Sequence, residues 1–191
     1  MEADWEIELG EGMPVIDASW AGLVDLHIAP ERVGEIAETQ LLPGLADALV
    51  RLNGLRSAVW TAKCDVWRVE DAVDPFELDA DAGESTVAMA CYIDLLPRAD
   101  QDWTTPQTAV SACRALVEKL GKVPLRACRV DLVVRAAKIA GDAQDLGVTA
   151  YVTGAGADEQ AARSRLARAV AALADTALCL RSRTCSDSPV Q

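Results

Sequence analysis

The chain has 191 residues, of which 51% are hydrophobic and 25% are charged, and its formal net charge is −12. This composition is that of a globular protein that is long enough to form a core without metal or disulfide cross-links. The acidic charge disfavours nucleic acids and anionic membranes as partners, because their surfaces are also negative.

The amino-terminal stretch MEADWEIELGEG is acidic and lacks the basic segment and apolar run of a signal peptide. No window approaches the roughly eighteen apolar residues that a membrane-spanning helix requires. We therefore expect a protein of a bacterial-type cytoplasm, with neither a membrane nor a nucleic acid as its partner.

The cysteine spacings match neither a zinc finger nor a thioredoxin-type motif, and the chain has a single histidine, His27. Most of the cysteines fall in apolar periodic segments, where a thiol behaves as a small hydrophobic side chain. We expect reduced core cysteines, no metal and no cofactor. The cysteines are Cys64, Cys91, Cys113, Cys128, Cys179 and Cys185.

Period-two and helical patterns alternate along the first half of the chain. Residues 14–28, PVIDASWAGLVDLHI, alternate apolar and polar side chains and predict a long first strand. Residues 30–53 predict helix, interrupted at Pro43 and Gly44, with the second part starting at about Leu42. Residues 57–69, SAVWTAKCDVWRV, predict the second strand.

The second half continues the pattern after an acidic linker. A helix is predicted between Thr105, as its cap, and Gly121, as its stop signal. The remaining predicted elements are a linker at 70–84, strands at 85–98, 125–140 and 146–154, a turn at 141–144 and a helix at 157–178.

The first six predicted elements follow the order of a split β-α-β plait. We therefore expect an α+β fold, a ferredoxin-like two-layer sandwich whose antiparallel sheet has helices on one face, with an extra C-terminal strand and helix. Residues 1–178 should form a single domain, followed by a polar tail at 179–191.

The polar positions of these strands should share the sheet face away from the helices. Carboxylates near a lysine or histidine can transfer protons, but opposite charges on such a face also pair simply as solvated surface. A third use is a dimer interface, which the exposed aromatic residues would favour. The residues of this face are Asp17, Ser19, Asp25, His27, Lys63, Asp65, Trp67, Tyr92, Asp94, Arg129, Asp131, Arg135 and Tyr151.

Within 57–69, alternation places Lys63 and Asp65 on the polar face and Cys64 on the apolar face. We expect Trp60 to pack beside Cys64, whose buried thiol should be inert. The three neighbours should therefore not form one reactive cluster. Trp67 is an aromatic residue on the polar face, which is typical of a contact for a ligand or partner.

His27 is the only imidazole, so histidine-based catalysis would require it. It is predicted to end the first strand on the polar face, whereas Cys64 has the parity of the apolar face. A cysteine–histidine pair would therefore need a bulge in one of the strands. We interpret His27 as a surface residue, with a catalytic role as the alternative.

The stretch YVTGAGADEQ places Gly154 and Gly156 between a strand and a helix, as in a phosphate-binding loop. Asp158 and Glu159 would repel phosphate at the helix start, so we interpret the stretch as a flexible turn before an acidic helix. The following arginines are interpreted as a solvated helix face, with a docking patch for an acidic partner as the alternative. They are Arg163, Arg165, Arg168, Arg181 and Arg183.

These patterns favour a non-catalytic binding module, an accessory or regulatory protein that acts as a homodimer or binds a protein partner, and a small molecule is a further possible ligand. The alternative is a small enzyme with acid–base residues on the same face. A cleft lined by Asp17, Asp25, Lys63 and Arg129 would favour the enzyme. The expected contact residues are Trp67, Lys63, Asp65, Tyr92, Asp94, Arg129 and Asp131, and the candidate catalytic residues are Asp25, His27, Lys63 and Asp65.

Overall fold

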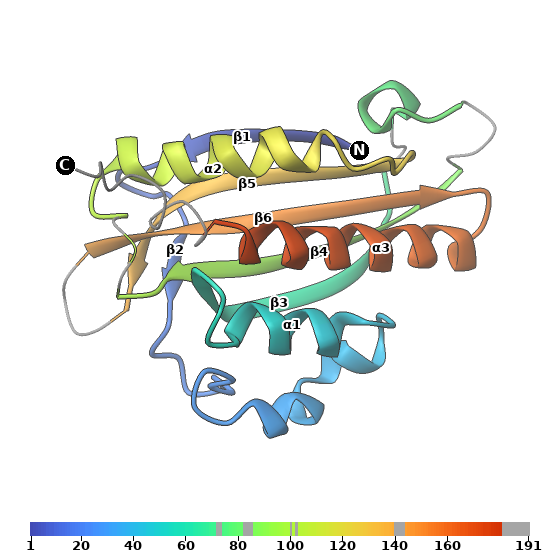
Figure 1. The fold of residues 1–191 in the computed structure, drawn as a ribbon. Coiled ribbons are helices and arrows are strands. Elements are labelled where there is room, and N and C mark those ends of the chain that lie inside the picture. The colour runs from blue at the N-terminus through green and yellow to red at the C-terminus, as the bar shows by residue number, and fades with distance from the viewer. Residues whose placement is uncertain (72–73, 82–85, 100, 102, 140–143, 181–191) are drawn as a thin grey trace, which may run out of the picture.

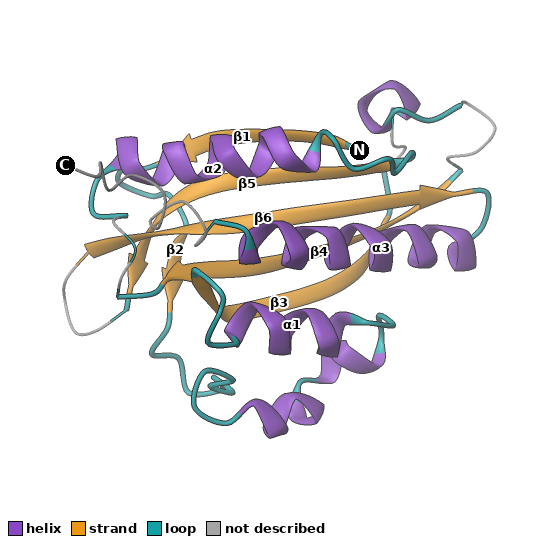
Figure 2. Cartoon of the chain, viewed as in Figure 1, coloured by secondary structure: helices purple, strands orange, loops and turns teal. Residues whose placement is uncertain are grey.

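The computed structural model describes residues 1–71, 74–81, 86–99, 101, 103–139 and 144–180. These residues form a mixed β-sheet with three α-helices on one face (Figures 1 and 2). The strands are β1 (Glu2–Glu8), β2 (Val15–Asp17), β3 (Val59–Val69), β4 (Val87–Pro97), β5 (Cys128–Lys138) and β6 (Gln144–Gly156). The α-helices are α1 (Leu45–Asn53), α2 (Pro106–Leu120) and α3 (Glu159–Leu178), and 3₁₀ turns occupy η1 (Pro30–Glu35), η2 (Ala37–Gln40) and η3 (Pro75–Leu78).

The strand order is β1-β5-β6-β4-β3, with the short β2 also paired to β5. β1 and β2 run parallel to β5, whereas the β5–β6, β6–β4 and β4–β3 pairs are antiparallel. β4 and β5 are therefore parallel, with β6 between them and α2 as the crossover, which is a split β-α-β unit. The α+β class is confirmed, but this mixed order does not confirm the ferredoxin-like arrangement, and the predicted extra strand, β6, is the centre of the sheet.

The prediction of a long strand over residues 14–28 was wrong, because only Val15–Asp17 pairs with the sheet. Asp17 accepts hydrogen bonds from the Ser19 backbone N–H at 2.8 Å and from its hydroxyl at 2.7 Å. Asp25 accepts one from the His27 N–H at 2.9 Å. Such local bonds from aspartate to the following backbone turn the chain and compete with strand pairing.

One edge of the sheet is formed by β1, a strand that was not predicted. Ala3 and Trp5 of β1 pack against the main core, and the Arg114 guanidinium lies 4.9 Å from the Trp5 ring centroid. Strict alternation from Glu2 to Glu8 was the available signal.

α2 begins and ends where its capping residues predict, whereas the helix predicted over residues 30–42 forms only the 3₁₀ turns η1 and η2. Thr105 caps α2 in a capping box with Thr108, and Gly121 follows its last turn. α1 begins after Gly44 and ends at Asn53. Leu49 of α1, Leu116 of α2 and Leu166 of α3 are buried in the main core.

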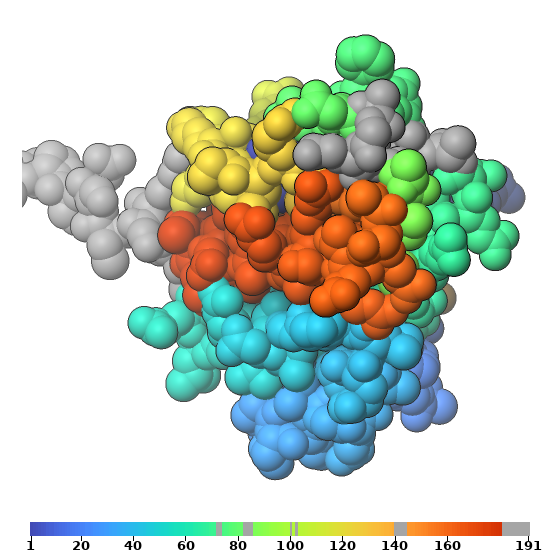
Figure 3. Space-filling view, turned by 90° about the vertical axis from the view of Figure 1, so that its right-hand side faces the viewer, coloured from blue at the N-terminus to red at the C-terminus, as the bar shows by residue number. Residues whose placement is uncertain are grey.

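Helix α3 lies in the middle of the helix layer, between α1 and α2 (Figure 3). Gly154 and Gly156 belong to β6 rather than to a flexible turn, which corrects the sequence interpretation. A Cβ at Gly154 would lie 2.3 Å from the Leu166 backbone nitrogen, and one at Gly156 would lie 2.5 Å from that of Ala162. The two glycines therefore permit direct backbone contact between β6 and α3.

Several predicted features lie wholly or partly outside the described residues. They are parts of the 70–84 linker, the turn at 141–144, most of the tail at 179–191, and the side chains of Arg181, Arg183 and Cys185. Among the described helices, none combines the length and apolar character that crossing a membrane would require.

We predict that Gly154→Ala lowers the free energy of unfolding by about 1–3 kcal/mol or more, because the added methyl group meets helix backbone that cannot move independently. The matched control is Gly34→Ala, whose Cβ would have no neighbour within 4 Å. It should change stability by less than about 0.5 kcal/mol. Urea denaturation of both variants checks this, and equal stability of the two would contradict the close contact between α3 and β6.

Candidate functional site

The sheet face opposite α1, α2 and α3, called the open face here, is bounded at each end by a small apolar cluster. One cluster brings β2 against the ends of β3, β4 and β5, and the other brings η3 against the opposite ends of β4, β5 and β6. A polar and aromatic band lies between them. The buried members of the clusters are Ile16, Ala18, Ala62, Leu96 and Ala137 at one end, and Leu78, Ala88, Ala127 and Ala155 at the other.

Three aromatic side chains on neighbouring strands cross this band, and we call them the aromatic ladder: Trp67 of β3, Tyr92 of β4 and Tyr151 of β6. The ring centroids of Trp67 and Tyr92 are 6.2 Å apart, as are those of Tyr92 and Tyr151. These spacings and tilted planes are typical of favourable aromatic pairs. Trp67 keeps 36% of its surface exposed.

Arg135 of β5 continues the aromatic ladder towards the β1 edge. Its guanidinium carbon lies 5.5 Å from the Tyr151 ring centroid, and Nη1 donates to the Tyr151 hydroxyl at 3.0 Å. Nη2 donates to Glu8 Oε2 of β1 at 2.6 Å. Contacts from Trp67 to Glu8 therefore connect all five long strands across the open face.

Three further charged groups on the open face also have hydrogen-bond partners. Arg129 Nε donates to Asp131 Oδ1 at 2.8 Å. The Thr149 hydroxyl donates to Asp94 Oδ1 at 2.6 Å and accepts from Arg135 Nη1 at 3.3 Å. Burial raises the pKa of Asp94, against the opposing effect of the Thr149 hydrogen bond, and burial likewise raises the pKa of Asp131 despite Arg129. Burial also raises the pKa of Tyr92 to about 12, so its phenol stays neutral.

β3 contains a register shift between Thr61 and Cys64, and this bulge reverses the side-chain alternation. Before it, Trp60 packs with the apolar cluster on the open face. After it, Cys64 packs against the main core beneath the helices. The expectation that Trp60 and Cys64 pack together was therefore wrong.

A hollow of about 420 Å³ lies beside the β3 edge, and Lys63, Cys64 and Asp65 all line it. The expectation that alternation keeps these three side chains apart was also wrong, because an edge hollow is open to residues of both faces. The Lys63 ammonium lies 5.2 Å from the Trp20 ring centroid, a cation–π contact. Burial, and then the nearby Glu38 carboxylate, raise the pKa of the Cys64 thiol to about 12.

His27 and Asp25 do not lie on the predicted polar face, because the strand that was to carry them is a turn. His27 Nε2 accepts a hydrogen bond from Arg98 Nη1 at 2.7 Å. Arg98 Nη2 donates to the carbonyl oxygens of Asn53 and Gly54, at the end of α1. The buried Arg98, which the sequence reading missed, thus links His27 to the C-terminal end of a helix.

The four residues proposed to mark an enzyme cleft are separated in the structure. Lys63 lines the hollow at the β3 edge, Arg129 lines a different hollow over β1, β5 and β6, and neither Asp17 nor Asp25 lines either one. Among the described residues, no group of three or more histidine, cysteine or acidic side chains could hold a metal ion. The four candidate residues therefore do not share one cleft. The hollow over β1, β5 and β6 does gather other acidic groups, of which Asp131 pairs with Arg129 and Glu8 pairs with Arg135.

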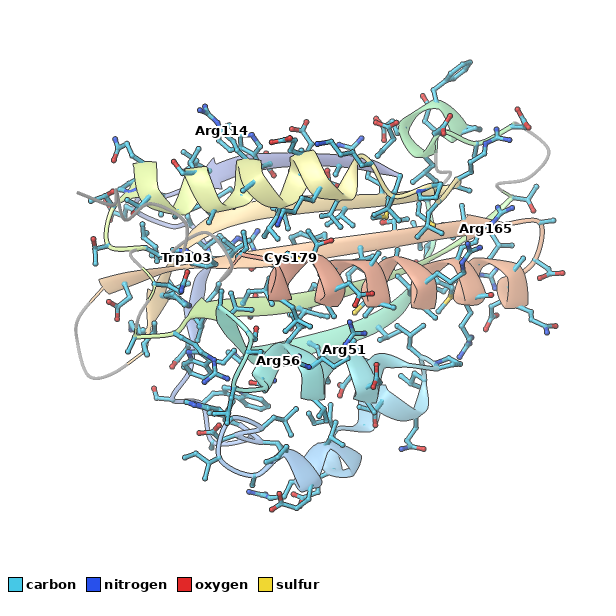
Figure 4. All side chains as sticks on the ribbon, in the orientation of Figure 1. Arg51, Arg56, Trp103, Arg114, Arg165 and Cys179 are labelled. Atoms are coloured by element: carbon cyan, nitrogen blue, oxygen red, sulfur yellow. The ribbon has the colours of Figure 1, made fainter. Side chains whose placement is uncertain are left out.

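The polar residues at the start of α3 cap the helix and hold it against β6. Asp158 caps α3 by accepting from the Ala161 N–H at 2.8 Å, and Arg163 pairs with Glu159 at 2.5 Å. Arg165 donates to the Ala155 carbonyl oxygen at 2.7 Å, which ties α3 to β6 (Figure 4). The interpretation of an acidic helix start is confirmed.

Comparison with protein-family models, with curated proteins and with solved structures gave no match to this chain.

We predict that Cys64 reacts slowly with iodoacetamide at pH 8, since a pKa of about 12 leaves roughly a thousandfold fewer thiolates than an ordinary thiol has. The exposed Cys179 at the end of α3 is the internal control (Figure 4). Peptide mapping by mass spectrometry resolves the two sites. The rate at which iodoacetamide labels Cys64 should rise as pH is raised. If Cys64 is labelled as fast as Cys179 at pH 8, the prediction is wrong and Cys64 is a reactive thiol.

We predict that Asp94→Asn becomes relatively more stable than the original protein as pH rises. The raised pKa of Asp94 means that the folded state holds this proton above pH 3.8, where the unfolded state releases it, so rising pH destabilises the original protein. Asparagine can still accept from Thr149 and has no such dependence. Urea denaturation at pH 3 and pH 7 measures the unfolding free energy of the variant minus that of the original protein. This quantity should rise with pH, and a fall with pH would contradict the prediction.

Proposed function

We propose that this chain is a cytoplasmic binding module, an accessory or regulatory protein whose open face contacts another protein chain. The observation that carries the proposal is the aromatic ladder, which ends in the exposed Trp67 on a face that none of the three α-helices covers. Tryptophan and tyrosine are the residues that most often dominate the energy of protein interfaces. A rigid sheet presents them at low conformational cost.

The state of the charged groups supports binding rather than proton transfer. Arg129 and Arg135 are engaged by Asp131 and Glu8, and Asp94 is engaged by Thr149. A general acid or base must instead reach a substrate within a water-poor cavity. Paired groups of this kind give an interface its orientation and specificity.

The hydrophobic boundaries of the open face also suit this role. The apolar clusters that contain Ile16 and Leu78 lie at opposite ends of the polar band. A partner that lies between them would contact the aromatic ladder in the middle and polar groups around it. Partner proteins and a second copy of the chain are both compatible with these borders.

We predict that Trp67→Ala weakens binding by about thirtyfold or more, as expected for removal of a dominant aromatic contact. Sedimentation velocity measures self-association, and affinity capture from the native host, quantified by mass spectrometry, measures other partners. Ile28→Ala is the matched control, because this exposed apolar side chain follows the Asp25 turn and is not part of the aromatic ladder.

Thermal unfolding would show that both variants keep the fold. The proposal fails if the original protein is a strict monomer and Trp67→Ala retains every captured protein at the level of the Ile28→Ala control.

A further inference from the structure

We infer that the open face receives a segment rich in lysine and arginine from another protein. This inference rests on the proposed function and adds the chemistry of the partner. The band between the apolar clusters carries seven acidic side chains and three basic ones. The acidic residues are Glu2, Asp4, Glu6, Glu8, Asp65, Asp94 and Asp131, and the basic residues are Lys63, Arg129 and Arg135.

The acidic excess is concentrated on the edge strand β1. Glu2, Asp4, Glu6 and Glu8 share one side of this strand, because Ala3 and Trp5 between them pack into the core on the other side. Only Glu8 of these four pairs with a cation, Arg135, within the described part of the chain. The other three carboxylates are exposed, which leaves their charge available to a partner.

The register of the sheet brings the acids and the aromatic ladder together. One row of directly paired residues reads Asp4, Asp131, Tyr151, Tyr92 and Asp65, from β1 to β3. Carboxylates thus stand on both sides of two tyrosine rings. Rings flanked by negative charge attract lysine and arginine through cation–π and ion-pair contacts acting together.

The chain's own Arg135 shows how this face accommodates a guanidinium group. It lies over the Tyr151 ring, donates to that residue's hydroxyl and pairs with Glu8. An incoming arginine would find the same types of group at Tyr92, with Asp65 directly opposite on β3. The open face therefore already carries the types of group that bind a guanidinium cation.

Charge complementarity also favours a basic segment over a second copy of the chain as the partner of the open face. A twofold dimer formed face to face would bring one acidic β1 stripe and its surroundings against an identical acidic surface. Like charges facing each other across an interface oppose association. A basic segment gains from the same field, which also steers it towards the face.

The test measures fluorescence anisotropy of a fluorescein-labelled oligo-arginine peptide with the full chain at physiological ionic strength, with oligo-glutamate as the charge control. The double variant Asp4→Asn with Glu6→Gln should weaken peptide binding roughly threefold to thirtyfold, as two exposed charge contacts would. Trp67→Ala should also weaken it. The control Glu31→Gln with Asp47→Asn removes the same charge from η1 and α1 and should leave binding within twofold, roughly the spread of a surface charge effect.

Equal weakening by both double variants would show attraction to net charge alone and would overturn the inference. Absence of peptide binding would also overturn it. If Trp67→Ala then still abolishes self-association or capture of another protein, the proposed function stands and only the partner's chemistry is wrong. If Trp67→Ala changes nothing in any of these measurements, both proposals fail.

Discussion

The arrangement of the molecule depends on the direct contact between helix α3 and the central strand β6. Gly154 and Gly156 remove the side chains that would separate the two backbones, so α3 lies close against the middle of the sheet. α1 and α2 pack on either side of it (Figure 3). With the helix layer on this side, the helix-facing side chains of β4, β5 and β6 are mostly buried, and the alternate side chains are left on the open face.

The open face is a consequence of that one-sided covering, and its chemistry follows from which strands are neighbours. β6 stands between β4 and β5, which brings Tyr151 beside Tyr92 and within reach of Arg135. β1 adds its carboxylates parallel to β5. Aromatic groups, paired charges and exposed acids thus meet on one surface, and the proposed recognition of a cationic chain rests on this combination.

The limits of prediction are clearest at the amino-terminal strands. Residues 14–28 alternate as a strand does, yet Asp17 and Asp25 bond to the backbone that follows them and turn the chain. β1 carries an equally regular alternation and does pair with β5. Alternation shows that a segment could form a strand, while the choice between such segments depends on the free sheet edge that the rest of the chain provides.

The sequence by itself determined the features that arise from local physics: the alternating faces of β4 and β5, the capped ends of α2, the buried stripe of α3 and the exposure of Trp67 on the polar side. Only the tertiary structure decided the strand order, the bulge in β3 and the hollow that Lys63 and Cys64 share. The physical reason is that alternation and capping involve residues a few positions apart. Strand order, register and edge hollows depend on contacts between segments that are distant in the chain.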